Sequence, residues 1–376
     1  MVKICSLTVM DETDPEIRFD NRSISNHYWD FKNNIEPNWL KNSNGELALS
    51  KMVDEIKKNG EGKEYDCLIG LSGGLDSSYL LHKAVTEFGL RPLVFHVDGG
   101  WNSKSAVKNI KNLIDVLNLD LFTEVIDWNE MKSFQLALFK SGVPHLDIPQ
   151  DMAFIATLYK YCEQHKIKYI LNGGNISTES VLMPLKYLYW GTDLRHLKDI
   201  FSKFGPVELN TYPFVSAIYT KFYIRYIKHV KILKPLNFMN FQKISSENEL
   251  IERYNWKPFS QKHFESRFTR FYEGFWLPTR FGYDMRKNQY SSLILSNQMS
   301  RADALGLLNE PPLSSDEVRN EFKFVANKLE ISVDELTYLH QMKKKYYFDF
   351  KNSKVMFDIG EAVLSFVNGS RRGGAI

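Results

Sequence analysis

The chain has 376 residues but few cysteines: Cys5, Cys67 and Cys162, with no Cys-x-x-Cys pair among them. Cys67 falls in an apolar run and Cys162 in a helical pattern, so both are predicted to be buried thiols. Sparse, unpaired cysteine suits a reducing cytoplasm and argues against a disulfide framework. Apolar runs of about 18 residues and a signal-peptide pattern are also lacking, so we expect a cytoplasmic protein without membrane insertion.

Charge of one sign is not in large excess, because 48 Lys and Arg stand against 45 Asp and Glu, for a net charge of +3. This balance gives no polyanion-binding signature, so no nucleic acid partner is expected. Aromatic residues are abundant, with 26 Phe, 19 Tyr and 7 Trp, many of them after residue 180. They could line a sugar or nucleotide pocket, or simply form an aromatic core.

One segment combines the features of a phosphate-binding turn. An apolar run ends in Ser-Gly-Gly-Leu-Asp-Ser-Ser at residues 72–78, and a helical pattern follows at once. Glycine lets a ligand approach the backbone, and the free N–H groups of a helix start attract an anion. A Walker-type P-loop is excluded because the loop has no lysine, and a Rossmann fingerprint because its third glycine is missing. The string resembles the pyrophosphate loop (PP-loop) of enzymes that cleave ATP between its α and β phosphates, which implies ATP contacts by Ser72, Gly73, Gly74, Asp76, Ser77 and Ser78.

Strand patterns alternate with helix patterns after residue 65, which predicts an α/β fold with a doubly wound, Rossmann-like parallel sheet. Strands are expected at Cys67–Leu71, Pro92–Val97, Leu121–Ile126 and Lys168–Asn172. Helices are expected at Ser50–Lys58, Leu75–Phe88, Ser105–Leu117, Met131–Lys140, Asp151–His165 and Ser315–Leu329. Ligands bind beyond the carboxyl ends of such strands, where the loops 72–78, 98–101 and 173–179 should converge.

Four regions are predicted from these patterns. Residues 1–64 form an irregular N-terminal segment plus one helix, and residues 65–180 form the PP-loop ATP-binding domain. Residues 181–345 form a mainly helical region for substrate or partner. Residues 346–376 are predicted to be a C-terminal tail, frayed over Gly369–Ile376.

Further motifs resemble the N-acetyl sugar amidotransferases of bacterial surface-glycan clusters, of the WbpG and PseA type. The resemblance extends to about residue 340. The motifs are Arg91-Pro92-Leu93, His96-Val97-Asp98-Gly99-Gly100-Trp101-Asn102-Ser103, Val125-Ile126-Asp127-Trp128, Pro144-x4-Pro149-x-Asp151, Asn172-Gly173-Gly174-Asn175-x3-Glu179, Lys234-Pro235-Leu236-Asn237 and Ser266-Arg267-Phe268-Thr269-Arg270-Phe271. The resemblance implies that ATP adenylates an acetamido oxygen and that ammonia then converts the group to an acetamidino group. It implies ATP and Mg²⁺ as cofactors and a pseudaminic, legionaminic or diacetamido uronic acid derivative as substrate, without deciding among these sugars.

Site residues are expected in the loops that carry these motifs. Asp76 is the first choice for a Mg²⁺ ligand and Asp98 the second. His96 could contact adenine or pack in the core, and Gly173 should lie near the nucleotide. Arg267 and Arg270 could neutralise phosphate or a sugar carboxylate, or form surface salt bridges. The expected catalytic residues are Asp76, Asp98 and Arg267, and the expected substrate contacts are Trp101, Asn175, Glu179, Arg267 and Arg270.

The N-terminal segment departs from the family, which usually begins with two Cys-x-x-Cys pairs that resemble a zinc site. Here the first pair is reduced to Cys5-Ser6-Leu7-Thr8, and the second position reads Ser25-Asn26-His27-Tyr28. One thiolate and one histidine do not complete a tetrahedral zinc site. We predict that structural zinc is lost and that hydrogen bonds and aromatic packing hold this degenerate zinc-ribbon-like segment.

Ammonia must come from outside the chain, because the sequence has no glutaminase signature. The resemblance implies a glutaminase subunit and a HisF-like barrel protein as partners. Three alternatives remain open: a tRNA thiolase, an amide-forming ligase, and a catalytically inactive nucleotide-binding scaffold. The unpaired cysteines disfavour thiolation, and the complete PP-loop string disfavours a scaffold.

Overall fold

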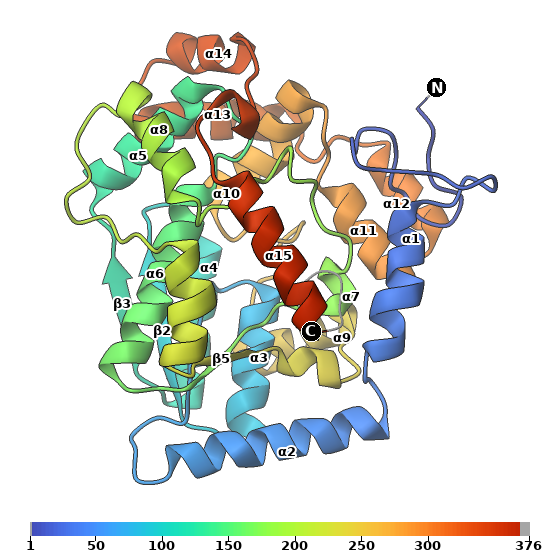
Figure 1. Cartoon of the computed structure of the whole chain (residues 1–376), viewed down its shortest axis with the longest axis vertical. Coiled ribbons are helices and arrows are strands. Elements are labelled where there is room, and N and C mark those ends of the chain that lie inside the picture. Colours follow the sequence, from blue (N-terminus) through green and yellow to red (C-terminus); the bar gives the residue numbers. More distant parts are fainter. Residues whose placement is uncertain (1, 369–376) are drawn as a thin grey trace.

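A five-stranded parallel sheet lies at the centre of the computed structural model, which describes residues 2–368 (Figure 1). The strand order is β3-β2-β1-β4-β5, and all neighbouring strands run parallel. The strands are β1 (Cys67–Gly70), β2 (Pro92–Asp98), β3 (Leu121–Val125), β4 (Tyr169–Leu171) and β5 (Lys231–Leu233). Helices cover both faces of the sheet, which confirms the predicted doubly wound α/β fold.

The side chains of β1 show how the two faces are covered, since successive residues of a strand point to opposite sides. Cys67 and Ile69 are fully buried with the apolar side chains of four helices: α2 (Ser43–Gly60), α3 (Leu75–Thr86), α4 (Lys104–Leu117) and α9 (Lys243–Tyr254). Leu68 is buried on the other face with α6 (Ile148–Gln164) and the π-helical segment η3 (Tyr219–Ile227). An apolar run without alternation is therefore what this central strand requires.

A second core is built mostly by helices, and large aromatic rings dominate it. Trp101, Phe268, Phe271 and Trp276 are all at most 1% exposed within it. The contributing helices include α5 (Trp128–Ser141), α8 (Leu194–Phe204), α10 (Arg267–Phe271), η5 (Tyr272–Phe281), α13 (Ser315–Leu329) and α14 (Val333–Gln341). In Figure 1, α13 and α14 lie at the opposite end of the molecule from α2. Many of the aromatic residues thus form a core.

The predicted elements recur with small shifts in their ends. All four predicted strands are present, but the three-residue strand β5 is too short to show a period in the sequence. Helix α2 begins before the predicted Ser50, because the Asn42 side chain caps its start by accepting hydrogen bonds from Asn44 N and Gly45 N. Helix α13 spans the predicted residues, and a capping box of Ser314 and Glu317 fixes its start.

The C-terminal region differs from the predicted tail. A 3₁₀ turn at Tyr347–Asp349 and helix α15 (Lys354–Asn368) occupy most of it, and the Phe357 ring stacks on Trp190 at 4.4 Å between centroids. The predicted frayed end, Gly369–Ile376, lies outside the described residues. Within residues 2–368, no helix has both the length and the apolar character needed to cross a membrane.

The N-terminal segment packs against α11 (Arg286–Leu295) and α12 (Arg301–Leu308), beside which it lies in Figure 1. Arg301 donates hydrogen bonds to the carbonyl oxygens of Cys5 and Thr8. The Ser25 backbone N–H donates to Cys5 Sγ at 3.3 Å. Burial alone would raise the pKa of Cys5, but hydrogen bonds from Ser25 and Thr8 outweigh burial and lower it. Three of the positions where the family has cysteine therefore meet in a hydrogen-bonded cluster.

We expect the purified protein to contain no stoichiometric zinc and to unfold at the same temperature with and without a chelator. Thr8 and Ser25 offer hydroxyls where zinc requires thiolates, and His27 Nε2 is bonded to Asp14 Oδ2 at 2.7 Å. Elemental analysis and thermal unfolding with EDTA measure this. One zinc ion per chain would contradict the prediction.

Candidate active site

The candidate site lies where the strand order reverses direction. The chain leaves β1 toward β2 on one side and leaves β4 toward β5 on the other, so β1 and β4 flank the switch point of the sheet. Ligands bind in the crevice outside the carboxyl ends of such strands. The PP-loop follows β1 and the loop 173–179 follows β4. A Cβ at Gly173 would lie 2.8 Å from the Asp76 carbonyl oxygen, so the two loops are in direct contact.

The PP-loop is held by its own hydroxyls. Ser72 N donates to Ser77 Oγ at 3.3 Å, and Gly74 N donates to Ser72 Oγ at 3.2 Å. Gly73 has φ +81°, and a Cβ there would lie 2.6 Å from the Ala106 carbonyl oxygen, so this position requires glycine. Gly74 is the N-cap of α3 and has no side chain to cap it. The first N–H groups of any helix have no intrahelical acceptors. Because no side chain caps those of α3, they can bind an anion.

A carboxylate already contacts this loop. Ser72 Oγ donates to Glu265 Oε1 at 3.1 Å, and a Cβ at Gly74 would lie 2.5 Å from the same oxygen. The Ser72 hydroxyl thus already donates to one carboxylate oxygen. The loop's donors fit a phosphate group.

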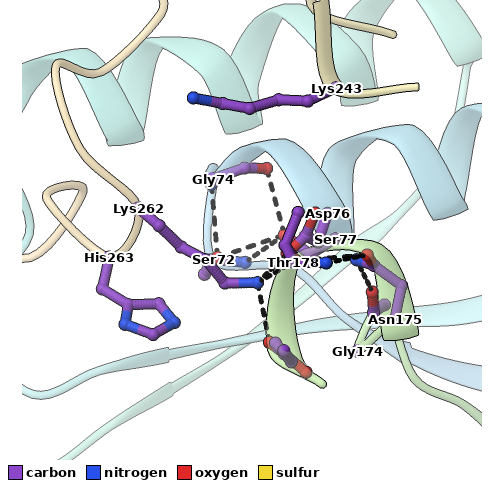
Figure 2. Close-up of polar contacts among 12 residues, drawn as sticks. Ser72, Gly74, Asp76, Ser77, Gly174, Asn175, Thr178, Lys243, Lys262 and His263 are labelled. Atoms are coloured by element: carbon purple, nitrogen blue, oxygen red, sulfur yellow. Dashed lines mark hydrogen bonds and ion pairs between the residues drawn. The ribbon is translucent and has the colours of Figure 1, made fainter. Parts of the chain in front are cut away.

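Lys262 joins the PP-loop to the loop after β4, as Figure 2 shows. Its Nζ lies 2.5 Å from Asp76 Oδ2, 2.7 Å from Glu179 Oε1 and 2.8 Å from Thr178 Oγ1. Burial opposes the charge of Lys262, but Asp76 and Glu179 outweigh it and raise the pKa of the ammonium group. Burial likewise opposes the charge of Glu179, and Lys262 outweighs it and lowers the pKa of that carboxyl. The site therefore contains a permanent cation, although the PP-loop itself has no lysine.

The loop after β2 organises itself around Asp98 and His96. Asp98 Oδ1 accepts hydrogen bonds from Gly100 N at 2.8 Å and from Asn102 Nδ2 at 3.2 Å. The buried His96 ring lies with Nδ1 2.8 Å from the Leu71 carbonyl oxygen and Nε2 2.9 Å from Asn102 Nδ2. Burial lowers the pKa of His96, so the ring is neutral, donates to Leu71 and accepts from Asn102. His96 thus links β2 to the strand that leads into the PP-loop.

Three predicted ligand contacts are buried in the protein instead. The Trp101 indole is 1% exposed, and its Nε1 donates to Gln135 Oε1 at 2.7 Å. Asn175 is 3% exposed and caps α7 (Ile176–Glu179), where its Oδ1 accepts from Thr178 N and Thr178 Oγ1. Ser78 is fully buried. Trp101 therefore has a packing role and Asn175 a capping role, whereas the buried Ser78 hydroxyl makes no hydrogen bond to the described residues.

Arg267 and Arg270 are bound to acidic side chains of α13. Arg267 Nη2 lies 2.9 Å from Glu321 Oε2, and its guanidinium carbon lies 3.3 Å from the centre of the Phe324 ring. Arg270 lies 3.0 Å from Glu321 Oε1 and 2.5 Å from Glu317 Oε1. Both arginines therefore form salt bridges, and they share the buried Glu321 as a partner. These arginines fasten α10 to α13.

The structure thus brings together Asp76, Ser72, Ser77, Gly73, Gly74, Gly173 and Glu179 of the predicted residues. Sequence reasoning missed Lys262, His263 and Glu265, which precede α10. The signal that could have located them is the adjacent Ser-Arg-Phe-Thr-Arg-Phe motif at residues 266–271.

The structure is a doubly wound α/β fold in which the Ser-Gly-Gly-Leu-Asp-Ser-Ser string follows the central strand β1. Residues 265–364 match the family model described as LPS biosynthesis protein WbpG-like, C-terminal domain. The resemblance drawn from the sequence is confirmed over this segment.

A curated relative is described as uncharacterized protein MJ1599 of Methanocaldococcus jannaschii. It is 33% identical over 130 residues, which are 34% of this chain and 46% of the relative, so the chain spans just under half of that protein. NMN synthetase from Francisella tularensis is a similar solved structure, with 13% identity, a TM-score of 0.32, and coverage of 77% of this chain and 97% of its own. NH3-dependent NAD synthetase from Campylobacter jejuni has 12% identity, a TM-score of 0.30, and coverage of 80% and 98%. TM-scores this low do not bear on the reaction.

Proposed function

We propose that the chain is an ATP-dependent amidotransferase that converts an acetamido group of a bacterial surface-glycan sugar to an acetamidino group. The observation that supports this proposal most is the position of Lys262, which contacts both Asp76 and Glu179. A PP-loop aspartate and the loop after β4 meet on one buried ammonium group at the switch point of the sheet. The WbpG-like domain begins three residues later and supplies Glu265 to the same loop.

The residue types suit adenylation of an amide. An amide carbonyl is a poor electrophile, so its oxygen attacks the α-phosphate of ATP, pyrophosphate leaves, and the oxygen becomes part of a leaving group. Ammonia then attacks the carbon and AMP departs. Ser72, Ser77 and the first N–H groups of α3 bind the phosphates, and Lys262 offsets their charge.

Mg²⁺ would be held by Asp76. Its Oδ2 is paired with Lys262, and its Oδ1 makes no hydrogen bond to the described residues, which fits a single carboxylate ligand to a phosphate-bound ion. When bound, the ion spreads the negative charge of the phosphates.

The substrate class and the partner belong to the same proposal. The matched domain is described as one of lipopolysaccharide biosynthesis, which supports a surface-glycan sugar as substrate. We propose a nonulosonic acid or a diacetamido uronic acid as that sugar. The reaction consumes ammonia, which is mostly protonated at neutral pH. A glutaminase subunit with a HisF-like barrel protein would deliver it directly.

The test is turnover of the full chain with ATP, Mg²⁺, ammonium chloride and a panel of free and nucleotide-linked N-acetyl sugars. We expect AMP and pyrophosphate with an accepted sugar, whose mass changes by replacement of oxygen with NH. Glutamine should replace ammonium only after the glutaminase and the barrel protein are added. Chromatography and mass spectrometry measure these products. ADP as the main nucleotide product, or efficient use of glutamine by the chain alone, would contradict the proposal.

A further inference from the structure

A pair of carboxylates begins helix α6 beside the candidate site. Asp147 immediately precedes the helix and Asp151 stands one turn later. Asp147 Oδ2 accepts from Thr269 Oγ1 at 2.6 Å, and Asp147 Oδ1 accepts from Gln150 Nε2. No described residue hydrogen-bonds the Asp151 carboxylate. Protein atoms surround the Asp151 carboxylate, but its surface is open to solvent. The carboxylate therefore lies in a recess that water can enter.

The Tyr272 hydroxyl is a second polar group without a partner here. Tyr272 is 4% exposed, and its hydroxyl is buried without a hydrogen bond to any described residue. It lies within electrostatic reach of Glu273, Asp147 and Asp151. Buried hydroxyls are nearly always hydrogen-bonded, so this unpaired hydroxyl is available to a small polar ligand near the carboxylates.

One short segment connects this acid pair to the PP-loop. Lys262 contacts Asp76, and Glu265 contacts Ser72. The intervening His263 extends away from the PP-loop in Figure 2, and its Nδ1 lies 3.1 Å from Glu273 Oε1. The neighbouring Ser266 donates to Gln150 Oε1 at 3.2 Å. One five-residue segment therefore contacts both the PP-loop and the first turn of α6.

The charges at the acid pair favour a small cation. Asp147, Asp151 and Glu273 face one basic group, His263. Burial opposes the charge of His263, but Glu273 outweighs it and raises the pKa to about 9. The Tyr272 and Tyr212 hydroxyls also interact electrostatically with the pair, and the Tyr212 hydroxyl donates to the Pro149 carbonyl oxygen at 2.6 Å.

The acid pair also has affinity for protons. Burial raises the pKa of Asp147 to about 6. Burial and then the charge of Asp147 raise the pKa of Asp151 to about 7. A carboxylate in this range can exchange a proton at neutral pH, as a general base must.

We propose that Asp151, with Asp147 and Tyr272, binds ammonium and removes its proton to generate the ammonia that attacks the adenylated amide. This inference rests on the proposed function. An N–H bond of ammonium breaks, the proton moves to the Asp151 carboxylate, and the electron pair stays on nitrogen. That pair forms the C–N bond as the C–O bond to the adenylyl group breaks and AMP leaves with its electrons. Asp151 returns its proton to water.

The first experiment measures ammonium binding without turnover. Thermal unfolding of the full chain is followed in ammonium, sodium, tetramethylammonium and magnesium chlorides at equal ionic strength. We expect ammonium to raise the unfolding midpoint more than the other cations, and Asp151→Asn to abolish that difference. Asp316→Asn, at the exposed first turn of α13, is the matched control and should keep it. Equal midpoints in ammonium and sodium, or a preference for magnesium, would overturn the ammonium site.

The second experiment separates a proton acceptor from a structural residue. With an accepted sugar, Asp151→Asn should lower amidine formation from ammonium by roughly a hundredfold near neutral pH, with a raised KM for ammonium. The deficit should shrink as pH rises, because free ammonia no longer needs a base. Sugar-dependent exchange of pyrophosphate into ATP should survive. An equal deficit at every pH would overturn the base role. If no sugar supports AMP release, the proposed function fails, while the binding experiment still decides on the ammonium site.

Discussion

Replacement of Lys262 by alanine is expected to reduce AMP release by about a hundredfold or more, which corresponds to on the order of 3 kcal/mol of transition-state stabilisation. The substitution removes the cation that lies 2.5 Å from Asp76 and 2.7 Å from Glu179. Both carboxylates would then face the phosphates of ATP without compensation. The rate is measured at saturating ATP with an accepted sugar.

Lys257→Ala is the matched control, because Lys257 is exposed on the same connection between α9 and α10. It should leave the rate within about twofold, because only the Lys257 backbone is bonded, to Asn109, and the substitution changes an exposed side chain. Lys262→Arg tests whether charge alone suffices, and we expect only partial recovery because a planar guanidinium does not fit three oxygens placed for an ammonium group. A folded Lys262→Ala protein with the wild-type rate would remove Lys262 from the site.

Asp76→Asn is expected to lower turnover by a similar factor, roughly a hundredfold, while the fold survives. Asparagine keeps the shape of the side chain and can still accept a hydrogen bond from Lys262. It loses the charge that Mg²⁺ requires, so the Mg²⁺ concentration needed for half-maximal rate should also rise. Steady-state rates across a magnesium titration measure both effects.

Asp54→Asn serves as the control for this change, because Asp54 is exposed on α2. The double variant Lys262→Ala with Asp76→Asn adds a sharper comparison. Residues in one ion pair are not additive, so the double variant should lose much less than the product of the two single losses. If the loss of rate in the double variant equals the product of the two single losses, Lys262 and Asp76 do not act as a unit. An unchanged magnesium requirement in Asp76→Asn would exclude Asp76 as a ligand.

Periodic and local features could be predicted from the sequence. The strand that leads to the PP-loop is an uninterrupted apolar run because β1 is buried on both faces. The glycines of the PP-loop mark a turn, and Gly73 does have a positive φ. The pairing of the PP-loop with the loop 173–179 could be predicted from topology alone, since carboxyl ends of parallel strands share one edge.

Contacts between residues distant in the sequence could not be predicted in the same way. Lys262 reaches Asp76 from 186 positions away, on a connection without regular structure. The motif around Arg267 gives no information on the position of Glu321. The sequence therefore could not decide whether Arg267 forms an ion pair or contacts a ligand. Trp101 has the sequence context of a loop residue, and only the packing of Phe268 and Trp128 around it shows that it is buried.

The segment from Lys262 to Phe271 makes the nucleotide-binding sheet inseparable from the C-terminal part of the chain. A fragment that ends before Lys262 would retain all five strands, but Asp76 and Glu179 would lose their shared counter-ion. Trp101 would also lose the ring of Phe268 that packs against it. The sheet alone therefore cannot be joined to another C-terminal half without loss of these contacts. A chimera designed to change the substrate would therefore need to keep the segment Lys262–Phe271 together with the sheet, or place its junction at another point in the chain.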